Sequence, residues 1–139
     1  MKAERQELLN QIERDVLSWD KVVVGDHLMG GREFRLGNEE IGHTHWNGDV
    51  DISFGSQLTD KLLKHKLARM HRYAPDTAIT HRVLSREDIP LAISLLRFSY
   101  LILWRKAVSD HPQTGDIVEA ELAKIPFYSL VDGVLYPQK

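Results

Sequence analysis

Apolar residues change their spacing along the chain, and each change marks a different expected element. Between residues 3 and 18 they recur every three or four positions among charged side chains, which predicts an amphipathic helix. Between residues 21 and 54 they fall into short alternating or β-branched runs, which predicts four strands. Three dipeptides typical of two-residue hairpin turns separate these runs: Gly30-Gly31, Gly37-Asn38 and Asn47-Gly48.

The second half of the chain returns to helical spacing with one interruption. The pattern predicts a fifth strand within residues 77–84, and helices over residues 57–66, 89–106 and 116–124. We therefore predict an α+β fold, in which an antiparallel β-meander of four to five strands has helices packed on the sheet. The length of the chain suits a single domain spanning residues 1–139.

Composition narrows the range of partners. Charged residues make up 27% of the chain and the net charge is −2, so we expect no nucleic-acid partner. The absence of cysteine excludes disulfides and thiolate metal sites. The apolar run over residues 89–104 is shorter than the roughly 20 residues of a membrane span and contains Arg97, so we expect no membrane partner. The charged start of the chain lacks the apolar stretch of a signal peptide, and we expect a cytoplasmic protein.

The stretch EEIGHTHWNGDVDIS, residues 39–53, combines two histidines with two aspartates. A two-residue turn at Asn47-Gly48 would pair His45 with Val50 and His43 with Ile52. This register turns both histidines to the apolar face of the sheet and both aspartates to the opposite face. The apolar residues expected to border a ligand on the histidine face are Phe34, Ile41 and Ile52.

Two imidazoles on an apolar face have two interpretations. They are either neutral core residues bonded to backbone groups, or they line a pocket. In a pocket, His43 and His45 would act as general base or acid, as donors to an oxyanion, or as metal ligands. His71 and His81 are candidates for further members, and a metal site would combine His43 and His45 with either of them. His27 joins the same side if Gly30-Gly31 is a tight turn.

The stretch REFRLGNEEIGHTHWNGDVDISF resembles the signature of the luciferase-like domain family, which includes the fungal luciferase and many short bacterial and fungal proteins. Its most specific part is the E-x-G-H-x-H pattern, here Glu40 to His45. Downstream, LLKHKLARMHRYAP is similar to the family's helix and histidine segment, with His71 in the matching place. A strand and a long helix containing Ser99 and Tyr100 complete the resemblance, which covers roughly residues 25 to 105.

The resemblance implies an oxidoreductase that acts on a small enolisable, aromatic or pyrone-like molecule with molecular oxygen. It implies no metal or flavin, so no cofactor is predicted, and His43, His45 and His71 would be the catalytic residues. The expected ligand contacts also include His81, from the predicted fifth strand, and Tyr100, from the long helix. The alternatives are a non-catalytic ligand-binding or interaction domain, and a protein with a metal held by His43, His45 and His71. The sequence leaves the substrate and the oligomeric state open.

Overall fold

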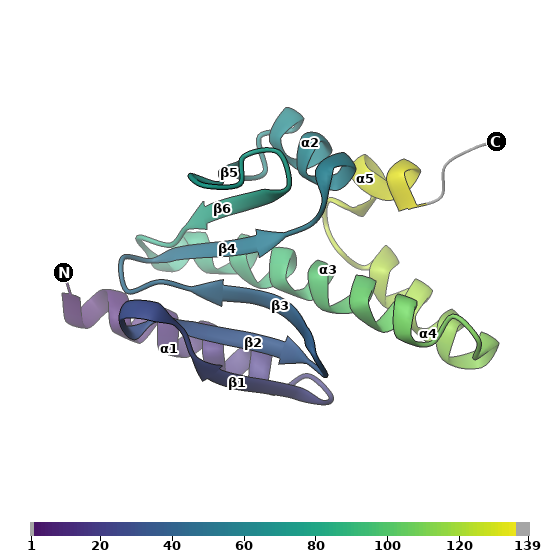
Figure 1. Ribbon diagram of the computed structural model, residues 1–139, viewed down its shortest axis with the longest axis horizontal. Helices are drawn as coiled ribbons and strands as arrows, with labels where there is room; N and C mark the ends of the chain where they lie inside the picture. The colour runs from purple at the N-terminus through teal and green to yellow at the C-terminus, as the bar shows by residue number, and fades with distance from the viewer. Residues whose placement is uncertain (1, 136–139) are drawn as a thin grey trace.

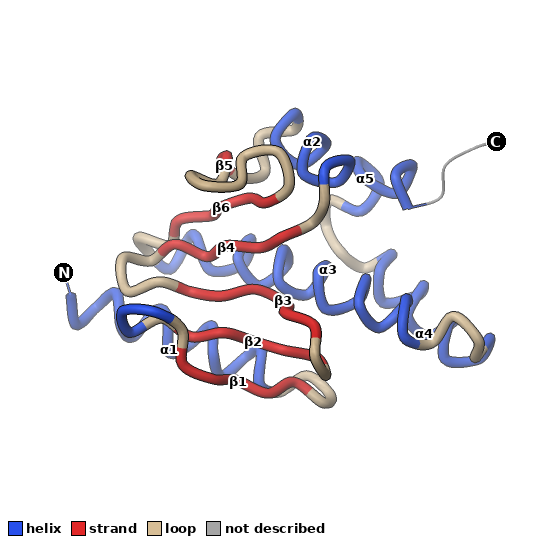
Figure 2. Tube along the Cα trace, in the orientation of Figure 1, coloured by secondary structure: helices blue, strands red, loops and turns tan. Residues whose placement is uncertain are grey.

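The computed structural model describes residues 2–135 and shows the predicted class of fold. Its strands form one antiparallel sheet in the order β1-β2-β3-β4-β6-β5, shown in red in Figure 2. The strands are β1 Val22–Asp26, β2 Arg32–Leu36, β3 Glu39–Thr44, β4 Asp49–Ser53, β5 Arg69–Met70 and β6 Ala78–Arg82. The predicted α+β domain with an antiparallel sheet is confirmed, and the two-residue β5 is the strand that apolar spacing did not indicate.

The helices follow the apolar spacing closely. They are α1 Lys2–Leu17, α2 Ser56–Lys64, α3 Ile89–Ala107, α4 Pro112–Ala123 and α5 Tyr128–Leu135, with 3-10 turns η1 Leu28–Gly30 and η2 Arg86–Asp88. The first four α-helices occupy the segments where helices were expected, whereas α5 lies in a segment whose mixed composition predicted nothing. Among residues 2–135, no helix combines the length and the apolar character that crossing a membrane requires.

Helices α1 and α3 cover one face of the sheet, as Figure 1 shows. Ile12 and Val16 of α1 and Leu95 and Leu96 of α3 are fully buried. Each such side chain contributes roughly 1.5–3 kcal/mol through the apolar surface it removes from water. In Figure 1 none of the α-helices within residues 2–135 crosses the opposite face of β2, β3 and β4. The hydrophobic core therefore uses one face of the central strands and leaves the other open.

Candidate functional site

A β-bulge in β3 places Ile41 and His43 on opposite faces of the sheet, although residues two apart in a regular strand share a face. Phe34 on β2 pairs with Gly42, whereas the next residue, Arg35, pairs with Glu40, so β3 contains one extra residue at this point. Ile41 is buried, and its carbonyl accepts a hydrogen bond of 2.7 Å from the hydroxyl of Ser99 on α3. A Cβ at Gly42 would lie 2.8 Å from Leu96, so glycine lets the bulge approach α3 closely.

The hairpin between β3 and β4 is closed by a hydrogen bond between His45 and Asp49, so three residues, 46–48, lie inside this pair and not the two that were predicted. The amide of His45 donates to the carbonyl of Asp49 (2.8 Å), and Gly48 adopts a left-handed conformation (φ +96°). His43 therefore pairs with Asp51. The predicted separation of histidines from aspartates is wrong: the bulge and the longer loop together bring His43, His45, Asp49 and Asp51 to the face that α3 does not cover.

This face contains a pocket of about 560 Å³ with a polar floor and an apolar rim. Its floor is formed by imidazoles, carboxylates and one hydroxyl from β3, β4 and β6, from the positions just after β1 and β3 and from the loop after β5. The residues of the floor are His27, His43, His45, Asp49, Asp51, His71 and Thr80. Its exposed apolar rim is formed by Leu28, Met29, Trp46 and Tyr73.

Asp51 is the centre of the floor. Its Oδ2 lies 2.7 Å from Nε2 of His45, 3.3 Å from Nε2 of His71 and 3.4 Å from Nε2 of His43. Its Oδ1 accepts a hydrogen bond of 2.6 Å from the hydroxyl of Thr80. The carboxylate is almost fully buried. One ionised carboxylate is thus surrounded by donors on both oxygens, which offsets the cost of removing it from water.

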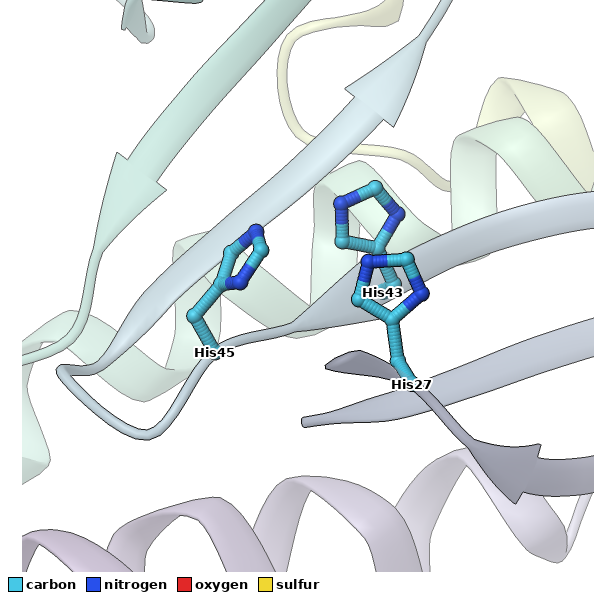
Figure 3. A group of neighbouring side chains, drawn as sticks. All are labelled: His27, His43 and His45. Atoms are coloured by element: carbon cyan, nitrogen blue, oxygen red, sulfur yellow. The ribbon is translucent and has the colours of Figure 1, made fainter. Parts of the chain in front are cut away.

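His27 stacks on His43, with ring centroids 4.1 Å apart, and His45 meets both rings edge-on (Figure 3). One ring nitrogen from each of these three residues lies within 4.8 Å of the others. The opposite nitrogens face carboxylates: Nδ1 of His43 lies 3.0 Å from Glu40, and Nδ1 of His27 lies 3.4 Å from Glu33. This cluster could hold a metal ion.

The hydrogen bonds of the floor determine which groups are charged. Burial disfavours the charged ring of His43, but hydrogen bonds to Asp51 and Glu40 outweigh this effect and raise the pKa of His43 to about 9. Burial likewise works against the charge of Asp51, yet hydrogen bonds from His43, Thr80 and His45 hold the pKa of this carboxyl well below its usual range. At neutral pH the floor contains an imidazolium next to a carboxylate.

His71 is held in one tautomer by its own loop. The backbone amides of Tyr73 and Ala74 donate to its Nδ1 at 3.1 and 3.0 Å. Because Nδ1 accepts these bonds, the ring hydrogen resides on Nε2, which points to Asp51. His71 therefore acts as a hydrogen-bond donor to the carboxylate, and its lone pair is not available to a ligand in the pocket.

The structure brings together the three histidines predicted to be catalytic, His43, His45 and His71, around Asp51. The residues predicted to contact a ligand do not border this pocket: Phe34, Ile41, Ile52, His81 and Tyr100. The first three are buried in the hydrophobic core and are at most 1% exposed. His81 donates from Nε2 to the carbonyl of Asp88 (2.8 Å), and the hydroxyl of Tyr100 donates to the carbonyl of Asp20 (2.8 Å).

Sequence reasoning placed Asp51 on the wrong face and did not identify Thr80. It included His27 only on the condition that Gly30-Gly31 forms a tight turn. The actual loop is Leu28–Gly30, closed by a hydrogen bond from the amide of His27 to the carbonyl of Gly31 (2.8 Å). The signal for Asp51 was present as the short spacing between histidines and aspartates in residues 43–51. Thr80 and His27 come from other strands and carry no such signal.

The comparison with protein families identifies the segment that carries this floor. Residues 38–99 match the family model described as Luciferase domain. The resemblance to the luciferase-like domain family is confirmed. The luciferase-domain segment runs from the start of β3 into α3 and contains Asp51, Thr80 and the three predicted catalytic histidines, whereas His27 lies outside it. Neither the curated proteins nor the solved structures gave a match to the chain.

Proposed function

We propose that this protein is an enzyme of the luciferase-domain type that oxidises a small organic molecule bound in the pocket over Asp51. The observation that carries the proposal is the convergence of His43, His45 and His71 on one buried carboxylate at the floor of an open pocket. All four residues lie in the segment that matches the luciferase domain. The resemblance supports molecular oxygen as the oxidant.

His45 is the proposed proton acceptor. Its Nε2 donates to Asp51 at 2.7 Å, so the neutral ring has its lone pair on Nδ1, which forms no hydrogen bond with any other described residue. A carboxylate that orients an imidazole and stabilises its protonated form is the arrangement of general-base catalysis by histidine. The substrate group that loses the proton is an acidic hydroxyl or an enolisable position.

His43 is the proposed partner of the resulting anion. It is bonded to a carboxylate on each side, Glu40 at Nδ1 and Asp51 at Nε2, so its ring has a fixed orientation before substrate arrives. A positive group placed in advance beside a developing negative charge stabilises that charge without reorganisation. The carboxylates of Asp51 and Glu40 would continue to stabilise the positive charge of His43 when a bound ligand excludes water from the pocket.

The rim supports a substrate with an apolar body. Leu28 and Met29 on η1, Trp46 on the β3–β4 loop and Tyr73 on the loop after β5 are each at least 53% exposed. Exposed apolar side chains around a polar floor are typical of sites that bind a ligand with one polar end. Excluding water over the floor would also protect the anion from protonation.

Oxygen uptake tests the proposal. Metal-free protein and protein supplemented with metal are supplied with a panel of hydroxy-pyrones and related enols, and binding is followed by the fluorescence of Trp46. We expect turnover by the wild type and at least a hundredfold loss of kcat in His45→Gln, a usual size for removing a general base. The exposed His65 just after α2 provides the matched control, because His65→Gln changes a histidine outside the pocket.

Two outcomes contradict the proposal. Equal oxygen uptake by His45→Gln and wild type would show that the oxidation does not take place in this pocket. Quenching of Trp46 by the panel without oxygen uptake under either metal condition would favour the alternative of a non-catalytic ligand-binding domain. A Trp46→Phe variant shows whether the fluorescence change arises at the rim, since the other two tryptophans, Trp19 and Trp104, lie outside this pocket.

A further inference from the structure

We propose that the pocket floor is a binding site for one divalent transition-metal ion, with His27, His43, His45 and Asp51 as its ligands. The inference goes beyond the proposed function: it shares the pocket but does not require turnover. Zinc and iron are the ions whose chemistry fits best, because the donors are imidazole nitrogens and a carboxylate oxygen and the chain has no cysteine.

The distances between donor atoms support one shared ion. The Nε2 atoms of His45 and His43 lie 2.7 and 3.4 Å from Oδ2 of Asp51, and one ring nitrogen of each of the three histidines lies within 4.8 Å of the others. Ligands bound to one zinc ion at about 2.0–2.1 Å stand roughly 3–3.5 Å apart. The His27 ring lies just after β1 and its side chain is 21% exposed, so a rotation of this ring towards the other two (Figure 3) would close most of the remaining gap.

The groups behind the ligands are those that metal sites commonly use. Metal-bound histidines usually donate their other ring nitrogen to a carboxylate, which fixes the ring and increases its basicity. Glu40 lies 3.0 Å from Nδ1 of His43, and Glu33 lies 3.4 Å from Nδ1 of His27. Both rings therefore present Nε2 to the floor.

The ligand carboxylate is supported in the same way. Thr80 donates to Oδ1 of Asp51 at 2.6 Å, and the Nε2 of His71 lies 3.3 Å from its Oδ2. Since Nδ1 of His71 accepts two backbone amides, this residue can only orient the carboxylate and cannot bind the ion itself. The proposed metal ligands thus include His27, whereas the sequence predicted His71 as the third histidine ligand.

The charges of the floor favour a cation. Three carboxylates, Glu33, Glu40 and Asp51, lie around the imidazoles, and Arg35 pairs with Glu33 on the outer side. A divalent ion would replace the hydrogens that His43 and His45 share with Asp51 and would supply the positive charge beside a bound anion. In that state His45 keeps its hydrogen on Nδ1, and acidity of the substrate hydroxyl would come from the ion.

Zinc titration of the untagged, chelator-treated protein tests the inference without any substrate. We expect one equivalent of Zn²⁺ to bind to the wild type and the affinity to fall more than about tenfold in His27→Gln and in Glu33→Gln, which removes the carboxylate behind His27 while leaving the proposed ligands in place. His65→Gln is the matched control and should bind as the wild type does. Circular dichroism verifies that each variant is folded, and Glu33→Gln serves alone if His27→Gln is not.

Each result decides one question. Less than one equivalent of Zn²⁺ on the wild type, or unchanged affinity in both His27→Gln and Glu33→Gln, would overturn the metal site and leave the oxygen-uptake result as it stands. One equivalent with the expected losses supports the site even if no substrate is turned over. Co²⁺ provides a second reading, because a visible spectrum that changes in His27→Gln shows that this ring is a ligand.

Discussion

The imidazolium of His43 should stabilise the metal-free fold below pH 9 and lose this effect in alkali. The unfolded chain releases the proton of His43 near pH 6.5, whereas hydrogen bonds to Asp51 and Glu40 raise the pKa of the folded state to about 9. Between these values the folded protein binds one more proton than the unfolded chain. Stability from this residue is therefore complete below pH 6.5 and disappears as the pH rises through 9.

The magnitude follows from the two pKa values. Each pH unit between them corresponds to about 1.4 kcal/mol, so the rise from 6.5 to about 9 corresponds to about 3 kcal/mol of unfolding free energy. The His43 side chain is only 17% exposed, so solvent screens its two ion pairs weakly. Asp51 stays ionised throughout this range because its pKa is held well below its usual value, and the other imidazoles facing His43 are those of His27 and His45.

Urea unfolding of chelator-treated wild type and His43→Gln between pH 7 and pH 10 measures this effect. We expect the wild type to exceed the variant by an amount that shrinks by about 2–3 kcal/mol across the interval. Taking the difference between the two proteins cancels the groups that titrate equally in both. A difference that stays constant from pH 7 to pH 10 would refute the assignment of a charged His43, whatever its absolute size.

Three substitutions test the elements that build the site, each by the free energy of unfolding in urea. Ser99→Ala leaves the carbonyl of Ile41 in the bulge without its buried donor and should cost about 1–3 kcal/mol, while Ser53→Ala on the exposed end of β4 should cost under about 0.5. Gly48→Ala puts a Cβ at φ +96° and 2.3 Å from a backbone oxygen, so it should cost more than about 2 kcal/mol; a smaller loss would show that the loop relaxes. Thr80→Val removes a hydrogen bond of 2.6 Å to the buried carboxylate of the floor and should cost about 1–3 kcal/mol; an unchanged midpoint would mean that this bond adds nothing.

The fold could be predicted because it depends on the spacing of apolar residues, and this spacing can be read from short stretches of the sequence. Ile12 and Val16 recur at helical spacing and are fully buried, and the strands alternate where strands were expected. The Gly37-Asn38 dipeptide does form the predicted two-residue turn, since Leu36 pairs with Glu39. Elements and their order follow from such signals without knowledge of the tertiary structure.

The orientation of the site could not be predicted in the same way, because it depends on single-residue differences in loop length. A glycine in the left-handed conformation suits a two-residue turn and a three-residue turn equally, so Asn47-Gly48 does not determine the register. Gly42 within β3 was the available sign of a bulge. A prediction that omits the bulge assigns His43 and Asp51 to the wrong faces of the sheet. The choice between His27 and His71 as a ligand depends on backbone amides that no side-chain pattern reveals.

The extra residue at Ile41–Gly42 has a consequence for how this protein can change. Ile41 at the insertion packs in the core, whereas His43 and His45, two and four residues later, face the pocket. A substitution at position 43 or 45 can therefore alter chemistry without requiring a compensating change on α3, whereas one at position 41 cannot. A single inserted residue has thus placed Ile41, which packs in the core, and His43, which faces the pocket, on opposite sides of one strand although they are two positions apart.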